Sequence, residues 1–132
     1  EKLIIELLSW MHRNKADYTN TFCYLMGEYK KKNEIYNETQ FTLWEKKWEN
    51  RIKLNNNSKE NSLKTMSKVN PLIIPRNHLV EESLKYATEN NDLSKVNELI
   101  KILQRPYERD SANSIYQSTP LMEENYVTYC GT

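Results

Sequence analysis

The chain has 132 residues, a length that fits one domain with a substantial buried core. Charged residues make up 28% of it and the formal net charge is +1, so it lacks the strong field by which proteins attract nucleic acid or anionic lipid. The weak net charge therefore predicts no nucleic-acid partner. No apolar run approaches the ~18 residues that a membrane span needs, so the sequence also predicts no membrane partner.

The first residues contain no sign of a targeting segment. The stretch EKLIIELLSWMHRN has charged residues inside its apolar pattern and no small-residue cleavage site, so we do not expect a signal peptide. The chain does not begin with Met, which leads us to expect that it has been cut from a longer polypeptide.

The few cysteines and histidines predict no metal centre. Two cysteines, Cys23 and Cys130, are too few for a disulfide framework or a four-ligand zinc site. The two histidines, His12 and His78, lie in separate segments without the spacing of metal ligands. We interpret each histidine as a surface or helix-end side chain.

Two amphipathic helices are predicted in the first thirty residues. The first covers residues 2–13, whose apolar side chains follow the i, i+3, i+4 spacing of one helix face: Leu3, Ile4, Leu7, Leu8 and Met11. Asp17 is the predicted N-cap of the second helix, because its carboxylate can accept hydrogen bonds from free backbone N–H groups. The apolar face of the second helix holds Tyr18, Phe22, Leu25, Met26 and Tyr29. Cys23 lies beside this face and is predicted to be a small, half-buried hydrophobe.

The third predicted helix has the clearest pattern. In TQFTLWEKKWENRIKLN, large apolar residues recur every three or four positions while the charged residues face elsewhere: Phe41, Trp44, Trp48 and Ile52. An aromatic stripe can form a base-stacking platform, but a stripe on one helix face predicts core packing instead. The basic run of residues 30–32 that precedes this helix is typical of a solvated helix end. Ser58 is the predicted cap of a short fourth helix with the apolar residues Leu63, Met66 and Val69.

Two prolines organise residues 69–87, VNPLIIPRNHLVEESLKYA. Pro71 is predicted to end the fourth helix and to bias Asn70 toward an extended backbone. Pro75 suits the first turn of a fifth helix over residues ~76–90, and Asn77 is an alternative cap for that helix. The inward face of the fifth helix is predicted to hold Leu79, Val80, Leu84 and Ala87.

The last predicted helix follows a short polar break at residues 90–92 and ends at Pro106. Its apolar residues are Leu93, Val96, Leu99, Ile100 and Leu103. A short loop between two helices predicts an antiparallel hairpin. The predicted fold is therefore all-α: a bundle of five to six amphipathic helices over residues 1–105, followed by an extended tail over residues 106–132.

The tail has no sustained periodicity. It is predicted to be either a disordered segment or an extended arm that lies across a surface of this chain or of another part of the protein. Its aromatic content favours the docked arm, through Tyr107, Tyr116, Tyr126 and Tyr129.

No catalytic motif appears in the sequence. Only two glycines are present, so no glycine-rich loop can hold a phosphate group and no dinucleotide fingerprint exists. The chain also lacks a G-x-S-x-G nucleophile elbow and an H-E-x-x-H zinc motif. We therefore predict no catalytic, cofactor-binding or metal-ligating residue within residues 1–132.

Three segments follow the pattern of one protein family. They are LLSWMHRNKADYTNTFCYL (7–25), MSKVNPLIIPRNHLVEESLKYATENNDLSKVNELIKILQRPYE (66–108) and YVTYCGT (126–132). The most specific features are VNP followed by RN, two helices separated by an acidic break, then PY, and a cysteine just before two small terminal residues. In this order the segments resemble the C-terminal region of the selenoprotein O family. FTLWEKKWENRI (41–52) fits the variable middle of that region less distinctively.

The resemblance implies a fold and an activity for a longer parent protein. The family has a protein-kinase-like fold, long taken for that of a pseudokinase, and transfers AMP from ATP to Ser, Thr or Tyr hydroxyls of proteins with Mg²⁺ or Mn²⁺. The residues that bind ATP and metal belong to the catalytic core, and none of them can be carried over onto residues 1–132. The resemblance therefore implies a helical C-terminal accessory region, whose partners are that core and the parent's protein substrates. It implies a cytoplasmic location in a bacterium and a mitochondrial one in a eukaryote.

Cys130 is the one residue here to which the resemblance assigns a role. Some family members carry selenocysteine near the C-terminus where others have cysteine, and Cys130 occupies that place. The resemblance implies a redox-active thiol that pairs with a cysteine of the catalytic core. The residues alone would favour an idle tail thiol, and a pairing with Cys23 is disfavoured because Cys23 lies beside an apolar helix face.

A function of another class stays open at this point. The chain could be a free-standing helical protein-interaction module without enzymatic activity. Kinase-like sequence upstream of Glu1 in the reading frame would favour the accessory region, whereas a start codon there would favour the module.

Overall fold

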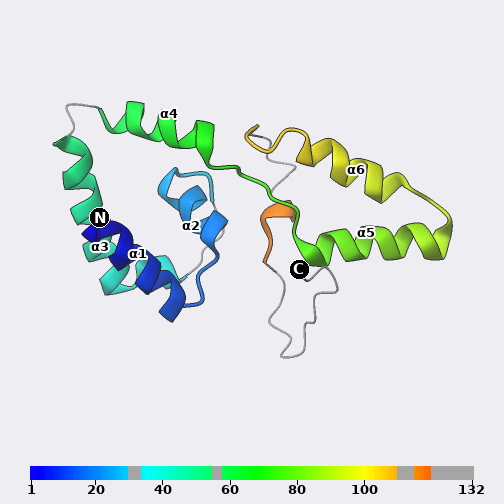
Figure 1. The fold of residues 1–132 in the computed structure, drawn as a ribbon, viewed down its shortest axis with the longest axis horizontal. Helices are drawn as coiled ribbons and strands as arrows, with labels where there is room; N and C mark the ends of the chain where they lie inside the picture. The colour runs from blue at the N-terminus through cyan, green and yellow to red at the C-terminus, as the bar shows by residue number, and fades with distance from the viewer. Residues whose placement is uncertain (30–33, 55–57, 110–114, 120–132) are drawn as a thin grey trace. The chain divides into compact units, whose positions relative to one another are not determined.

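The computed structural model describes residues 1–29, 34–54, 58–109 and 115–119 (Figure 1). Within these ranges the chain has six α-helices, short 3₁₀ turns and no strand, so the predicted all-α fold class is confirmed. The chain forms two compact units, Glu1–Pro71 and Leu72–Thr132. The division at residue 105 into a helical domain and a tail stays a prediction.

The first unit is built around the packing of two helices, α1 and α3. Helix α3 also contacts the 3₁₀ helix η1 and helix α4 (Figure 1). The elements of this unit, in chain order, are α1 (Lys2–Arg13), α2 (Tyr18–Leu25), η1 (Glu34–Asn37), α3 (Thr39–Lys53) and α4 (Lys59–Val69).

A cluster of aromatic side chains fills the core of the first unit. The ring centroids of Trp10 and Phe41 lie 4.5 Å apart, and Tyr24 stacks on Tyr36 at 4.1 Å. Tyr36 is almost wholly buried and its hydroxyl is 3.2 Å from that of Thr21. Burial is the main cause that raises the pKa of Tyr36 to about 12, so its phenol stays neutral in this core.

The aromatic stripe predicted on the third helix is confirmed as core at three of its four positions. Phe41, Trp44 and Ile52 are buried. Trp48 is only half-buried, because it lies at the edge of the cluster, with its ring stacked on Trp44 at 6.1 Å between centroids.

The predicted apolar face of the first helix is partly wrong. Leu7 and Met11 are buried as expected, but Ile4 and Leu8 are exposed. Trp10 is buried instead, because its large ring fills the space beside Phe41 and so fixes which side of α1 faces inward.

Other residues predicted to be apolar contacts are also exposed. On α2, Tyr18 is exposed, whereas Leu25 and the following Met26 and Tyr29 are buried. On α4, Val69 is exposed and Leu63 and Met66 are only half-buried, because α4 contacts the rest of the first unit mainly through α3.

Both predicted side-chain caps of the first unit are confirmed. The backbone N–H of Asn20 donates to Asp17 Oδ1 at 2.8 Å, and that of Asn61 donates to Ser58 Oγ at 3.1 Å. Asn70 has the extended backbone predicted before Pro71, with φ −102° and ψ 110°. Cys23 is fully buried rather than half-buried, with Sγ 3.6 Å from the carbonyl oxygen of Pro71.

The second unit contains the predicted antiparallel hairpin of α5 (Asn77–Asn90) and α6 (Ser94–Leu103), which lie side by side (Figure 1). Asn91 ends α5 in a left-handed conformation, with φ 51°. The predicted helix start needs correction: Arg76 is the N-cap, because its carbonyl accepts the first helical bonds from Leu79 and Val80. Pro75 therefore precedes the cap and Asn77 is the first helical residue, not the cap.

Fewer apolar residues of the hairpin are buried than the sequence predicted. Leu99 is buried, and Leu79, Val80 and Ala87 on α5 are half-buried. Three predicted members are exposed, because two helices bury only one seam between them: Leu84, Leu93 and Ile100.

The ends of the hairpin are tied together by backbone contacts. The backbone N–H groups of Leu72 and Ile73 donate to the Pro106 carbonyl at 2.7 and 3.3 Å. Residues 115–119 of the tail join this contact because Gln117 Nε2 donates to the Leu72 carbonyl at 3.2 Å. Of the four tyrosines that favoured a docked arm, Tyr107 is exposed, Tyr116 is half-buried with its hydroxyl 2.9 Å from Glu98 Oε1, and Tyr126 and Tyr129 lie outside the described residues.

We expect Trp44→Ala to lower the free energy of unfolding by about 3–5 kcal/mol, because it empties a buried aromatic site. Trp48→Ala should cost clearly less, since that ring is half-exposed. Urea unfolding followed by far-ultraviolet circular dichroism measures both. Leu43→Ala on the same helix is the control and should stay within about 0.5 kcal/mol of the parent. Equal losses for Trp44→Ala and Leu43→Ala would contradict the core described above.

We expect Asp17→Ala to destabilise the first unit by about 1 kcal/mol, because the backbone N–H of Asn20 loses its acceptor. Asp17→Asn is the matched variant, since an asparagine side-chain oxygen can still cap the helix. Urea midpoints of the two variants separate the cap from the charge. If both variants lose the same stability, the contribution of Asp17 is electrostatic and the cap is not the cause.

Candidate functional site

The described residues bring together no cluster of metal-ligating side chains. Among residues 1–29, 34–54, 58–109 and 115–119, no three His, Cys, Asp or Glu side chains come together to hold a metal ion. No helix in the same ranges is long and apolar enough to cross a membrane. The candidate site is therefore a surface, and the first unit has one that is hollowed.

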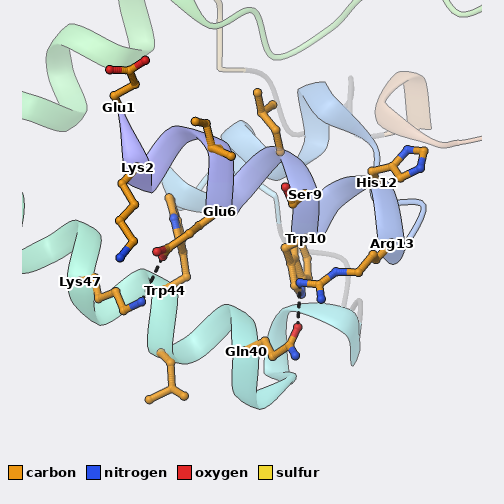
Figure 2. Close-up of a pocket in the computed structure, with 13 residues that line it drawn as sticks. Glu1, Lys2, Glu6, Ser9, Trp10, His12, Arg13, Gln40, Trp44 and Lys47 are labelled. Atoms are coloured by element: carbon orange, nitrogen blue, oxygen red, sulfur yellow. Dashed lines mark hydrogen bonds and ion pairs between the residues drawn. The ribbon is translucent and has the colours of Figure 1, made fainter.

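An open groove runs along the junction of α1 and α3 (Figure 2). Its volume is about 1210 Å³. Trp10 and Trp44 line it from the two helices, and both side chains also belong to the aromatic core. The groove is lined by Glu1, Lys2, Ile5, Glu6, Leu8, Ser9, Trp10, His12, Arg13, Gln40, Leu43, Trp44 and Lys47.

Hydrogen bonds hold the two indole rings in place. Trp10 Nε1 donates to Glu38 Oε2 at 2.6 Å, which joins α1 to the residue that precedes α3. Trp44 Nε1 donates to the backbone carbonyl of Leu3 at 2.8 Å, which joins α3 back to α1. Because each ring is both packed and hydrogen-bonded across the helix pair, its orientation at the base of the groove is restrained.

Two polar pairs cross the groove. Lys47 Nζ lies 3.0 Å from Glu6 Oε2, and Arg13 Nη2 donates to Gln40 Oε1 at 3.1 Å (Figure 2). Both pairs are exposed or partly exposed, so each contributes little to stability. The position of the pairs matters more for binding than for stability, because they place charged and polar groups beside an apolar surface.

The apolar part of the groove is unusually exposed. Ile5 is 59% exposed, Leu8 44% and Leu43 54%. A single exposed aliphatic side chain is ordinary, but several around one hollow are typical of a surface that contacts another protein segment. The chemistry that this groove offers is non-covalent binding of an apolar segment with polar flanks.

The residues singled out in the sequence lie in different places. His12 lines the groove, whereas His78 stands near the start of α5 in the second unit. Partial burial and the nearby Arg76 guanidinium lower the pKa of His78, so its neutral form is favoured. Cys23 is buried in the first unit and takes no part in the groove. Cys130 and the basic run of residues 30–32 lie outside the described residues.

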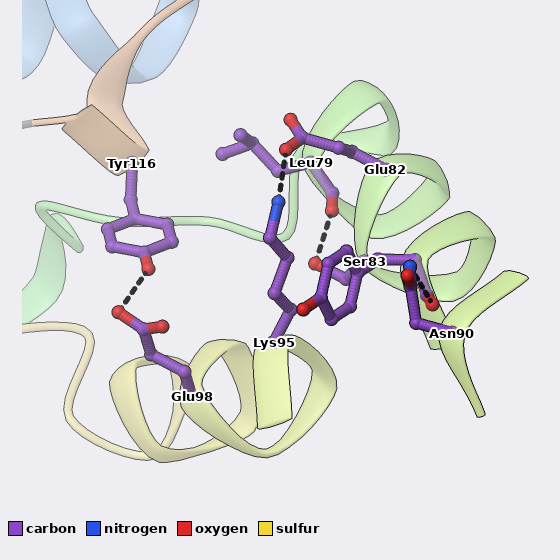
Figure 3. A network of polar contacts seen from close by, with 8 residues as sticks. Leu79, Glu82, Ser83, Asn90, Lys95, Glu98 and Tyr116 are labelled. Carbon is purple, nitrogen blue, oxygen red and sulfur yellow. Dashed lines mark hydrogen bonds and ion pairs between the residues drawn. The ribbon is translucent and has the colours of Figure 1, made fainter. Parts of the chain in front are cut away.

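A polar network in the second unit links the tail to the hairpin (Figure 3). Tyr116 donates its phenolic hydrogen to Glu98 Oε1 at 2.9 Å. Lys95 Nζ lies 2.9 Å from Glu82 Oε1 and 4.7 Å from the ring centroid of Tyr86. Burial and the Glu98 carboxylate raise the pKa of Tyr116 to about 12, so this phenol is a hydrogen-bond donor and not a nucleophile at neutral pH. The network is structural.

The groove was not identified from the sequence, although a signal for it was present. Trp10 and Ile5 were left out of the predicted face of the first helix. Residues 3–11 are apolar on several sides of that helix, and a helix that is apolar all round is usually covered on more than one side. That pattern would have pointed to a second contact surface.

Comparison with known proteins assigns the chain to a family. The family model for Protein adenylyltransferase SelO matches residues 1–104. Proteins described as Protein nucleotidyltransferase YdiU match the whole chain, with 44% identity in Pelagibacter ubique, 40% in Alcanivorax borkumensis and 41% in Clostridium botulinum strain Alaska E43. The chain spans 27%, 28% and 27% of the length of these three relatives. No solved structure matches the chain.

The match to the family model extends over most of the chain and includes all six described α-helices. The sequence-based resemblance, which rested on three separate segments, is confirmed by this match. The chain belongs to the SelO family.

Proposed function

We propose that residues 1–132 are the helical C-terminal accessory region of a protein adenylyltransferase. The observation that carries this proposal is the SelO family match over residues 1–104, in a chain that spans 27% of the Pelagibacter relative. The remaining length of such a relative is ample for a kinase-like catalytic core.

The chemistry of the parent protein is assigned to that core. The core binds ATP with Mg²⁺ or Mn²⁺ and moves AMP to a Ser, Thr or Tyr hydroxyl of a protein substrate. The two glycines of this chain, Gly27 and Gly131, lie far apart in the sequence and cannot form a phosphate-binding loop. The contribution of residues 1–132 is to buttress the core. In a bacterial host, the parent protein would act in the cytoplasm.

Cys130 has a separate role in this proposal. We assign it a redox-active thiol that pairs with a cysteine of the catalytic core. Formation of the disulfide removes two protons and two electrons from the two thiols, and molecular oxygen or a disulfide such as oxidised glutathione accepts them. Cys23 is the less suitable partner, because its sulfur is fully buried beneath the surface of the first unit.

The second candidate function is a free-standing helical interaction module. The exposed apolar groove favours it, because such a groove could bind a separate protein. The two candidates differ in whether kinase-like sequence is part of the same reading frame.

We expect the complete polypeptide encoded by the reading frame to transfer AMP, and residues 1–132 alone neither to bind ATP nor to transfer AMP. Both are incubated with labelled ATP, Mg²⁺ or Mn²⁺ and a general protein acceptor, and incorporated label is counted. A reaction without protein is the control. Label transferred by residues 1–132 alone would place catalysis inside this chain, and no transfer by the complete polypeptide would contradict the proposed activity.

We expect Cys130 to be disulfide-bonded in the complete polypeptide purified without reductant. Digestion under non-reducing conditions and mass spectrometry should yield the Cys130 peptide linked to a core peptide, and dithiothreitol should remove the link. Cys130→Ser is the matched variant and should lose this linked species alone. A Cys130 thiol that stays free after mild oxidation, with activity indifferent to reductant, would reduce it to an ordinary tail thiol.

A further inference from the structure

Helix α1 carries apolar side chains on more sides than the first unit can cover. Leu7, Trp10 and Met11 are buried against the rest of the unit. Ile5 and Leu8 are exposed on the groove side. A helix with this distribution is typical of one that is enclosed by protein on two sides.

The exposed apolar side chains of α1 lie in the same groove as an apolar side chain of α3. Leu43 of α3 lines the same groove and is itself exposed. Exposed aliphatic side chains from two helices therefore share one hollow, which the hydrogen-bonded Trp10 and Trp44 rings also line. Because the two indoles are already anchored, binding on this surface does not have to order them.

The charges around the groove are mixed. Lys2, Arg13 and Lys47 are matched in part by Glu1 and Glu6, and the Lys47–Glu6 pair is already formed. A surface with so small an excess of positive charge does not select a polyanion such as nucleic acid. It fits an apolar protein segment with ordinary polar flanks.

The position of Glu1 indicates where such a segment would come from. Glu1 lines the groove, so any polypeptide that precedes it is joined to the chain at the edge of this surface. The relatives are between three and four times as long as this chain, because it spans 27% of their length. A segment in the same polypeptide has a high effective concentration at the groove and needs little intrinsic affinity to occupy it.

We propose that the groove between α1 and α3 is the docking surface for an apolar segment of the catalytic core in the same polypeptide. This inference rests on the proposed function and names the surface through which the accessory region supports the core. Ile5, Leu8 and Leu43 make the apolar contact, and the two polar pairs that cross the groove flank this contact.

The accessibility of introduced thiols in the complete polypeptide tests this proposal. Leu8→Cys and Leu43→Cys are made separately, and alkylation by a small maleimide is followed at each position by peptide mass spectrometry. Leu54→Cys is the matched control, because Leu54 is 77% exposed in the same unit and does not line the groove. We expect both groove thiols to react at least about tenfold more slowly than the control thiol, because docking covers them.

A photo-crosslinker attached through Leu43→Cys identifies the occupant. In a mixture of isotopically light and heavy protein, the crosslink is expected to join the Leu43→Cys peptide to an apolar core peptide of the same isotope. Crosslinks between light and heavy peptides, or slow labelling that disappears on dilution, would mean that a second copy fills the groove and would overturn the proposal. Groove thiols that react as fast as the control thiol would also overturn it.

The AMP-transfer assay separates this inference from the proposed function. If the complete polypeptide transfers AMP but its groove thiols react as fast as the control, the activity stands and the docking surface is wrong. If the polypeptide neither transfers AMP nor protects the groove thiols, both the proposed function and the inference fail.

Discussion

The first unit depends on how the Trp10 indole is held between α1 and α3. The ring is almost wholly buried, lies 4.5 Å from Phe41 and 5.9 Å from Tyr36 between centroids, and donates its N–H to Glu38 at the start of α3. Packing and hydrogen bonding together fix the orientation of α1 about its own axis. That orientation sends Leu7 and Met11 inward with Trp10, and it leaves Ile5 and Leu8 facing the groove. The location of the candidate site is thus a consequence of core packing.

Local signals in the sequence predicted where the α-helices lie, but they did not predict which side of each helix is buried. Asp17 and Ser58 cap their helices because a cap depends only on residues within one turn. Which side of α1 is buried depends on Phe41 and Tyr36, which lie about thirty residues away in the sequence. Ile4 and Leu8 have the same spacing as buried residues, so periodicity alone could not separate them from Leu7. The groove was missed for the same reason, because it is defined by two helices and not by one.

The second unit shows the same limit at a helix start and in the tail. At the end of the first unit, the sequence placed Pro71 and the extended Asn70 correctly, since the restriction imposed by proline acts on the adjacent residue. It did not identify Arg76 as the N-cap of α5, because that side chain makes no capping hydrogen bond and no local rule selects it. The Gln117 contact with Leu72 spans 45 residues and lies in a segment without periodicity, so no pattern could have predicted it. The aromatic content of the tail favoured a docked arm, and Tyr116, one of the residues named for it, donates a hydrogen bond to Glu98 of α6.

The groove and the core of the first unit share the Trp10 and Trp44 side chains, which links stability to binding. Each indole is anchored across the helix pair, Trp10 to Glu38 and Trp44 to the Leu3 carbonyl. A segment that docks on the exposed Ile5, Leu8 and Leu43 would therefore meet a base that does not need to rearrange. By covering α1 on its second side, such a segment would add apolar burial to a helix pair that otherwise holds its position through one face. Because binding to the native state alone raises its stability, residues 1–132 and a segment docked on them would each stabilise the other.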